Sequence, residues 1–147
     1  MAPHESAQGD ATVGHRERVG FLLARIGRGA WLRFEEALRP LALRPRHVVI
    51  LMELRDRDAT TQQALLEDLG FDAGNLVVLL NDLESQGLAT RKRDPADRRR
   101  HIVQMTRAGT ARLAEAESAL REAEDTLLAP LDAAARDQLQ SLLLAIE

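Results

Sequence analysis

Apolar residues recur at helical spacing along most of this chain, and glycine, proline and capping residues divide the pattern into segments. From about Arg16 to Leu38 the apolar positions repeat near every 3.6 residues, which predicts an amphipathic helix of roughly 23 residues and about 34 Å. One small domain cannot cover so long a stripe. We therefore expect part of it to pack against a second chain.

The segment from Pro45 to Arg57 carries a dense apolar run. Its periodicity alone does not distinguish a buried helix from a strand. Pro45 suits the first position of a helix, and the neighbouring segments are helical, so a helix is the prediction.

The next two segments form a helix-turn-helix signature. Thr60 and Gln63 fit a capping box for a helix over residues 60–69, and Gly70 fits its end. Asp72 is a good N-cap for a second helix, which runs to residue 85 or 86, just before a glycine.

Beyond this point the pattern becomes strand-like, because LATRKR and RRRHIVQM flank the turn sequence DPAD. Thr106 then opens another helix, Pro130 stops it, and Asp132 caps a last helix. The resulting order predicts a mostly α protein: a winged helix-turn-helix with a two-stranded β wing, together with helices at both ends of the chain.

Charge is concentrated in one place. Residues 91–100 read RKRDPADRRR, with six basic and two acidic residues, so they carry +4 while the other 137 residues carry -7, which gives the formal net charge of -3. DNA binding depends on releasing counterions at a local basic surface and needs no overall positive charge. A solvated charged hairpin is the alternative, but the preceding helix-turn-helix favours contact with DNA.

Composition excludes several classes of protein. The chain has no cysteine, so disulfides, thiolate zinc sites and thiol redox switches within it are excluded. Residues 1–14 lack the basic start and apolar core of a secretory signal, and no apolar run approaches the ~18 residues that span a bilayer. We expect a cytoplasmic protein with a flexible tail over residues 1–14.

The spacing of leucines in the second helix of the helix-turn-helix predicts which side of that helix faces the core. At 100° per residue, four leucines fall on one side and should be core: Leu76, Leu79, Leu80 and Leu83. The opposite side carries Gly74, Val78, Asn81, Asp82 and Ser85, with Asn75 toward one flank. Gly74 would let a phosphate approach the helix N-terminus, and Asn75 or Asn81 could bind adenine edges.

The predicted DNA contacts therefore come from the start of the first helix of the motif, the exposed face of the second, and the wing. They are Thr61, Gln62, Gly74, Asn75, Val78, Asn81, Arg91, Arg93, Arg98, Arg99 and Arg100. Asp97 and Arg99 would share one face if this part of the wing is extended. The hypothesis is that Arg99 enters the minor groove while Asp97 orients its guanidinium.

Three runs together resemble the MarR family of winged helix-turn-helix regulators: LRPRHVVILMELRD, ALLEDLGFDAGNLVVLLNDLESQGLATRKRDPADRRRHIVQMTRAG and LLAPLDAAARDQLQSLL. The most specific match is in the wing, where Asp97, Arg99, Met105 and Thr106 fit the family's D-x-R followed by an apolar residue and Thr. The resemblance implies an obligate homodimer with interleaved first and last helices. It also implies a recognition helix in each major groove and wings that touch the minor groove.

The same resemblance implies a division of the chain after the tail. Residues 15–42 would form a dimerisation helix, 43–106 the DNA-binding region and 107–147 the C-terminal dimerisation helices. It further implies that a small phenolic or anionic molecule between the two regions changes the spacing of the recognition helices. Trp31, Phe34, Arg46 and His47 are the candidate ligand-binding residues at this junction.

The chain also departs from the family pattern. Asp82 on the recognition helix would repel phosphate, and the absence of cysteine excludes the family's cysteine-based peroxide sensing. This predicts weaker reliance on the recognition helix and more on the wings. It also supports an alternative function, a winged-helix protein-interaction module without operator binding.

No enzyme chemistry is indicated. The four histidines are scattered without an H-E-x-x-H helix, and neither a G-x-S-x-G elbow nor a phosphate-binding glycine loop occurs. Asp94, Asp97 and His101 could surround a cation, but turn formation and salt bridges with arginine are the favoured roles. We expect no catalytic residue, no cofactor and no metal.

Overall fold

The computed structural model describes residues 14–147, so the predicted tail lies outside the described residues except for Gly14. The helices are α1 Val19–Leu38, α2 Pro45–Arg57, α3 Gln62–Leu69, α4 Ala73–Ser85, α5 Arg107–Leu127 and α6 Ala133–Leu144. The strands are β1 Ala59–Thr61, β2 Ala89–Arg93 and β3 His101–Met105, and short 3-10 turns occupy His15–Glu17 and Arg39–Leu41. The predicted mostly helical winged fold is confirmed.

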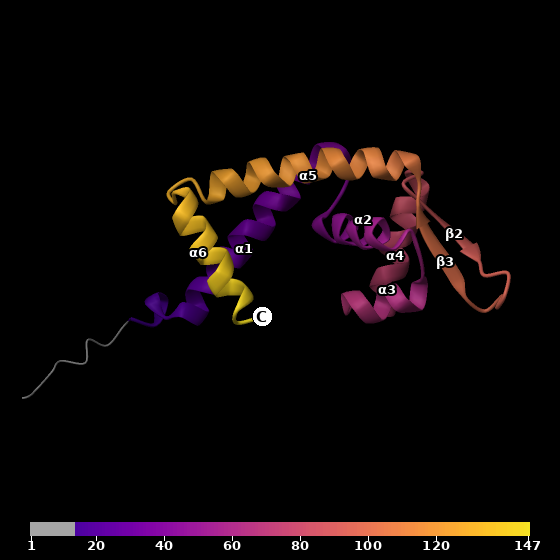
Figure 1. The fold of residues 1–147 in the computed structure, drawn as a ribbon, viewed down its shortest axis with the longest axis horizontal. Helices are drawn as coiled ribbons and strands as arrows, with labels where there is room; N and C mark the ends of the chain where they lie inside the picture. Colours follow the sequence, from indigo (N-terminus) through magenta and orange to yellow (C-terminus); the bar gives the residue numbers. More distant parts are fainter. Residues whose placement is uncertain (1–13) are drawn as a thin grey trace, which may run out of the picture.

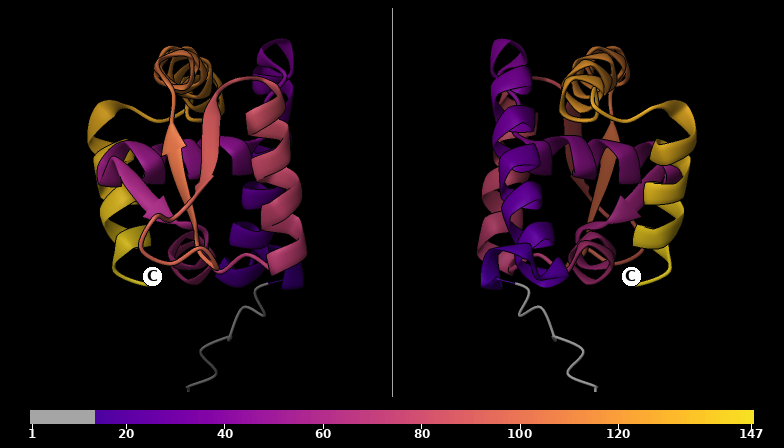
Figure 2. Two further views of the ribbon diagram at one scale, coloured as in Figure 1. Left: turned by 90° about the vertical axis from the view of Figure 1, so that its right-hand side faces the viewer. Right: turned by 90° about the vertical axis from the view of Figure 1, so that its left-hand side faces the viewer.

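Helix α5 spans the length of the molecule (Figure 1). At one end lie α1 and α6, and at the other lie α2, α3, α4 and the β2–β3 hairpin, which projects as a wing. Figure 2 looks along α5 and places α1 and α6 on opposite sides below it. None of the helices in residues 14–147 has the length and apolar character needed to cross a bilayer.

The core lies in the half of the molecule that carries the wing. All four leucines predicted for the inner side of α4 are almost completely buried, and they pack with Ile50, Leu51 and Leu54 of α2 and Leu65 of α3. The prediction that these leucines are core is confirmed. Because they occupy one side of α4, the rotation of this helix about its axis is fixed.

The sheet contains a strand that the sequence pattern did not predict. Its order is β1-β3-β2, with both pairings antiparallel, and Thr60 of β1 lies opposite Val103 of β3. The predicted helix start and capping box at Thr60 are therefore wrong. Helix α3 instead begins after Thr61, whose side-chain hydroxyl oxygen accepts a hydrogen bond from the Ala64 N–H at 3.1 Å. Pairing with the open edge of β3 outweighs the local capping signal.

The wing turn is longer than predicted. Residues 98–100 were expected in the second strand, but β3 begins only at His101. The Asp94 carboxylate accepts a hydrogen bond from the Ala96 N–H at 2.9 Å, and the Arg100 N–H donates to the Asp97 carbonyl at 2.9 Å. Aspartates that satisfy nearby backbone N–H groups favour turns over strands. Among the described side chains, no group of three or more acidic or histidine residues could hold a metal ion.

The wing is fixed to α5 at a close junction. The Thr106 hydroxyl donates to the Gly87 carbonyl at 2.6 Å and accepts from the Gly109 N–H at 3.0 Å, and the Thr106 N–H donates to the Leu88 carbonyl at 3.0 Å. A Cβ atom on Gly109 would overlap the Leu88 carbonyl oxygen and lie 2.7 Å from Met105 Cγ. Only glycine lets α5 approach the chain this closely.

We predict that Gly109→Ala lowers the free energy of unfolding by about 3 kcal/mol, because the backbone oxygen of Leu88 cannot move aside as a side chain could. Denaturant unfolding measures the change. Gly74→Ala is the control, since a Cβ there would meet only Asp72 Oδ1 at an ordinary 3.6 Å. Equal stability of Gly109→Ala and wild type would contradict the close junction.

Candidate nucleic-acid interface

The outer face of α4 carries little charge. Gly74, Val78 and Asn81 are exposed, and Val78 presents 52 % of its surface. Asp72 caps the helix, because its carboxylate accepts a hydrogen bond from the Asn75 N–H at 2.8 Å. This agrees with the expectation that Asp72 has a capping role. The outer face of α4 is therefore uncharged and open to a large partner, while the exposed Asp72 carboxylate occupies its N-terminus.

The wing lies beside this helix-turn-helix. A groove of about 350 Å³ is lined by Thr61 and Gln62 at the start of α3, Ala73 at the start of α4, and Arg99 and Arg100 of the wing turn. The groove thus brings together candidate residues from the start of α3 and from the wing, while α4 contributes Ala73, which was not a predicted contact. Arg93, which pairs with His101 in the sheet, and Arg98 of the wing turn are also exposed but do not line this groove.

The wing turn gives Asp97 a different contact from the one predicted. Its carboxylate accepts a hydrogen bond from the backbone N–H of Arg99 at 3.0 Å, and its second oxygen lies 3.8 Å from Arg100 Nε. The segment is not extended, so Asp97 and Arg99 do not share a strand face. Any orienting effect of Asp97 on Arg99 would act through the backbone.

Arg91 points into the domain. Its guanidinium donates to Glu84 Oε2 at 2.9 Å and Asn81 Oδ1 at 2.6 Å, with a longer contact of 3.4 Å to Gln62 Oε1. Sequence reasoning counted Arg91 with the phosphate-binding cations and did not consider Glu84. The sequence did contain a signal for this ion pair, because Glu84 lies on the predicted helix seven residues before Arg91 of the following strand.

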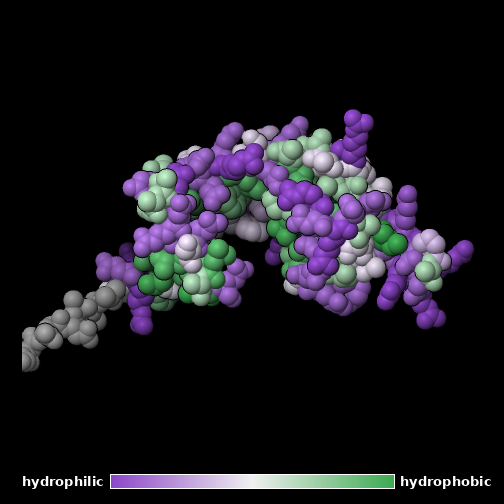
Figure 3. Space-filling model, in the orientation of Figure 1, coloured by the Kyte–Doolittle hydropathy of each residue, from purple (hydrophilic) through white to green (hydrophobic). Residues whose placement is uncertain are grey.

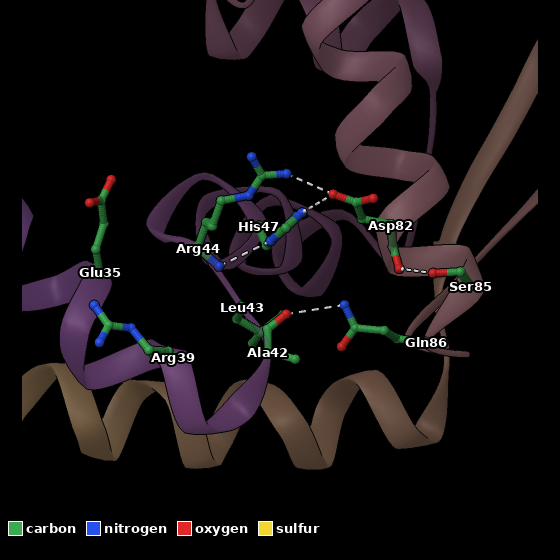
Figure 4. Close-up of a pocket in the computed structure, with 9 residues that line it drawn as sticks. All are labelled: Glu35, Arg39, Ala42, Leu43, Arg44, His47, Asp82, Ser85 and Gln86. Carbon is green, nitrogen blue, oxygen red and sulfur yellow. Dashed lines mark hydrogen bonds and ion pairs between the residues drawn. The ribbon is translucent and has the colours of Figure 1, made fainter.

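Asp82 does not face the outer side of α4. Its carboxylate accepts from Arg44 Nη2 at 2.7 Å and lies 3.3 Å from His47 Nε2 (Figure 4). The expected repulsion between Asp82 and phosphate is therefore offset by a cation that precedes α2. The reason is rotation: Asp82 lies on the flank of α4 that faces α2, whereas Glu84 lies on the flank that faces the wing.

The Arg44–Asp82 pair borders a cavity of about 460 Å³ between the two regions of the chain. Figure 4 shows Glu35 and Arg39 on one side of it and Asp82, Ser85 and Gln86 on the other. His47 is buried, and its Nδ1 accepts a hydrogen bond from the Arg44 N–H at 3.0 Å. The ring proton of neutral His47 must therefore sit on Nε2, facing Asp82. Burial, and then the charge of Arg44, lower the pKa of His47 below 6.5.

The four candidate ligand-binding residues do not share one cavity. Trp31 and Arg46 line a space of about 290 Å³ together with Asn75, while His47 lines the larger cavity beside it. Phe34 instead lines an apolar groove of about 540 Å³ between α1, α5 and α6. Asn75 thus lies on the junction side of α4, away from the wing.

Comparison with known proteins agrees with a winged helix-turn-helix that binds DNA. Residues 43–100 match the family model of the MarR family. A Thauera aromatica protein assigned to transcriptional regulation of the hcr operon is 29 % identical over 137 residues, covering 90 % of this chain and 82 % of that protein. Residues 43–100 thus match the MarR family model, and most of the chain is similar to a protein assigned to transcriptional regulation.

Solved structures of similar proteins have the same fold. A probable transcriptional regulator from Pseudomonas aeruginosa superposes with a TM-score of 0.78 at 27 % identity, covering 89 % of this chain and 98 % of that one. A cysteine-to-serine mutant of MarR from E. coli, solved with operator DNA, gives 0.75 at 25 % identity, covering 86 % and 91 %. Members of the MarR family are regulators, not enzymes, which agrees with the expectation from sequence.

We predict a pH-dependent loss of stability through His47. Because its folded-state pKa is lowered, the unfolded chain binds the proton more tightly, so the free energy of unfolding falls as pH decreases below 6.5 toward the folded-state value. His47→Gln should remove this part of the slope while keeping an acceptor for the Arg44 N–H. Urea unfolding from pH 7.5 to 5 measures it, and an identical slope in both proteins would refute the assignment.

Proposed function

We propose that this protein is a homodimeric MarR-family repressor that binds a pseudo-palindromic operator and is released by a small anionic or phenolic ligand. The observation that carries the proposal is the groove in which the starts of α3 and α4 meet Arg99 and Arg100 of the wing. The similarity to a MarR structure solved with operator DNA supports it. Because bacterial DNA lies in the cytoplasm, the protein would act there.

In this proposal α4 enters the major groove. Its outer face, with Gly74, Val78 and Asn81, carries no charge to repel phosphate. The N-terminal N–H groups that the Asp72 carboxylate does not bind would attract phosphate. The wing supplies the cations: Arg93, Arg98, Arg99 and Arg100 are all exposed. A local basic surface on an acidic protein gives affinity through counterion release while limiting nonspecific adhesion.

The proposed dimer is formed by residues 15–42 and 107–147, with residues 43–106 binding DNA. None of the residues of α6 is buried, and α1 buries only Leu38. Figure 3 shows apolar residues gathered at this end of the molecule. Large apolar side chains exposed there are Val19, Leu23, Ile26, Leu32, Leu142, Leu143, Leu144 and Ile146. An apolar groove lined by both helices continues this surface, and a second copy would fill it.

The proposed ligand site is the pair of cavities at the junction. Arg44 lines both of them, Arg39 lines the larger and Arg46 the smaller, whereas Glu35 lines both and Asp82 the larger. The arginines would bind a ligand anion, and Trp31 offers an aromatic surface. A ligand carboxylate would compete with Asp82 for Arg44. Since Asp82 belongs to α4, this competition would alter how the recognition helix is held against α2.

DNA binding is tested by selecting genomic fragments and titrating a labelled fragment at several salt concentrations. We expect affinity to fall steeply with salt. Arg99→Ala should weaken binding and lower the salt slope by about 0.9 for each phosphate that the two wings no longer neutralise. Absence of specific binding even at low salt would favour the protein-interaction alternative.

The orienting role of Asp97 has a matched control. Asp97→Ala removes the acceptor for the Arg99 N–H, so it should weaken operator binding although it removes a negative charge near DNA. Asp97→Asn keeps an acceptor without the charge and should bind at least as well as wild type. Tighter binding by Asp97→Ala at every salt concentration would show that the carboxylate only repels phosphate.

The dimer is tested by sedimentation at micromolar concentration, where we expect no monomer. Ile26→Glu places a charge in the apolar groove and should weaken dimerisation by tenfold or more, because a buried unpaired carboxylate is costly. Val78→Glu is the control, since Val78 is equally exposed, at 52 %, but lies on the outer face of α4. It should remain dimeric and lose DNA binding. A dimeric Ile26→Glu would contradict the assigned interface.

Ligand release is tested with a panel of hydroxybenzoates added to the operator complex. We expect at least one to raise the dissociation constant of the operator, and Arg44→Gln to lose that response while remaining folded. Arg33→Gln is the control, because the Arg33 guanidinium bonds the Gly29 carbonyl of its own helix at 3.1 Å. An unchanged response in Arg44→Gln would place the ligand elsewhere.

A further inference from the structure

The inward-pointing Arg91 affects how α3 and α4 would meet DNA. We propose that Arg91 is a positioning residue that fixes the side-chain amides of Asn81 and Gln62, so that both present N–H donors to the major groove. The regulator would then favour guanine or thymine over adenine and cytosine at the base pairs these amides contact. This inference rests on the proposed DNA-binding function and specifies its base preference.

The geometry holds Arg91 firmly. Its guanidinium forms an ion pair with Glu84 at 2.9 Å, and the two side chains are only 20 % and 30 % exposed. The same nitrogen, Nη2, donates to Asn81 Oδ1 at 2.6 Å, and Nη1 approaches Gln62 Oε1 at 3.4 Å. One arginine of the wing strand β2 thus links the recognition helix to the start of α3.

The chemistry of the contact determines which amide atom faces inward. A guanidinium has five N–H donors and no acceptor, so it attracts the carbonyl oxygen of an amide and repels the NH₂ group. With Oδ1 of Asn81 turned toward Arg91, its Nδ2 and two hydrogens are left for an external partner. The same holds for Nε2 of Gln62, which also lines the groove beside the wing.

Base edges in the major groove differ in what they offer such a donor. Guanine presents two acceptors, N7 and O6, and thymine presents O4, whereas adenine pairs an acceptor with an N6 amino donor and cytosine presents only a donor. Bidentate binding of adenine needs an oxygen and a nitrogen from one amide. Since Arg91 engages the oxygen of Asn81, the proposal favours guanine or thymine for Asn81, whereas the sequence-based expectation was that Asn75 or Asn81 binds adenine edges.

Glu84 makes this role distinct from phosphate binding. It neutralises Arg91 within the domain, so removal of Arg91 should change base preference more than the salt dependence of affinity. Arg93 differs: it lies on the same strand, is exposed and forms no ion pair in the part of the chain that the structure describes. The two arginines therefore form a matched pair.

The test compares full-length wild type, Arg91→Met and Arg93→Met by binding selection on randomised duplexes, followed by titration of every single-base variant of the selected operator. For wild type we expect at least one pair in each half-site where guanine or thymine is favoured roughly tenfold or more. Arg91→Met should lose that preference at the same base pair, because the side-chain amides of Asn81 and Gln62 would then be free to rotate. Arg93→Met should weaken all sequences by one factor and keep the preference.

Arg91→Lys extends the comparison, since an ammonium also donates without accepting and should retain part of the preference. An equal loss of affinity on every sequence for Arg91→Met, with preferences unchanged, would overturn the inference and leave the proposed function intact. A wild-type protein that selects no duplex would overturn both.

A second measurement does not depend on Arg91→Met being folded. Each favoured guanine is replaced by 7-deazaguanine, which lacks the N7 acceptor, and binding is measured for wild type and Asn81→Ala. We expect the base change to weaken wild type severalfold at one position in each half-site and to leave Asn81→Ala unaffected there. If thymine is favoured instead, loss of O4 by replacement with 5-methyl-2-pyrimidinone gives the same comparison. The inference would be overturned if no operator position lost affinity both when its acceptor is removed and when Asn81 is replaced.

Discussion

The buried leucine stripe of α4 is the constraint on which the rest of the interface depends. Leu76, Leu79, Leu80 and Leu83 are each at most 1 % exposed, so rotation of α4 by even one residue would bring a leucine into water and a polar side chain into the core. Fixing this rotation assigns a direction to every other side chain of the helix. Gly74, Val78 and Asn81 face outward, while Asp82 and Glu84 fall on opposite flanks.

The two flanks distribute the charge of the recognition helix. Asp82 meets Arg44, which precedes α2, and Glu84 meets Arg91 of β2, so each carboxylate is paired with an arginine from a different element. The outer face is left without charge although the helix contains two acidic residues. In the proposed DNA complex, the cations that meet the phosphate backbone would come from the wing turn, so an acidic chain would present a basic surface beside an uncharged helix.

Periodicity predicted the parts of the fold in which local pattern and tertiary packing agree. The bounds of α2 and α4 follow from Pro45, Asp72 and the leucine spacing, and these helices begin where predicted. Strand β1 could not be predicted, because three residues are too few to show an alternation of apolar and polar positions. Their pairing depends on the edge of β3. For the candidate site, the sequence predicted that arginines gather on the wing, but it assigned residues 98–100 to the second strand and not to the turn. It could not assign the partners of Asp82 and Arg91, which depend on how α4 packs in three dimensions.

The two arginine–carboxylate pairs differ in a way that suits different roles. Arg91 and Glu84 are mostly shielded from water, so their geometry is held. Arg44 and Asp82 remain 58 % and 41 % exposed, and an ion pair in that setting contributes only about 0–1 kcal/mol. A ligand anion could replace Asp82 at Arg44 at little cost. Because Arg44 also holds the His47 ring through its backbone N–H, the exchange would occur at a point fixed to α2 and would act chiefly on α4. In the proposed ligand response, the weaker Arg44–Asp82 pair would therefore be the contact that changes.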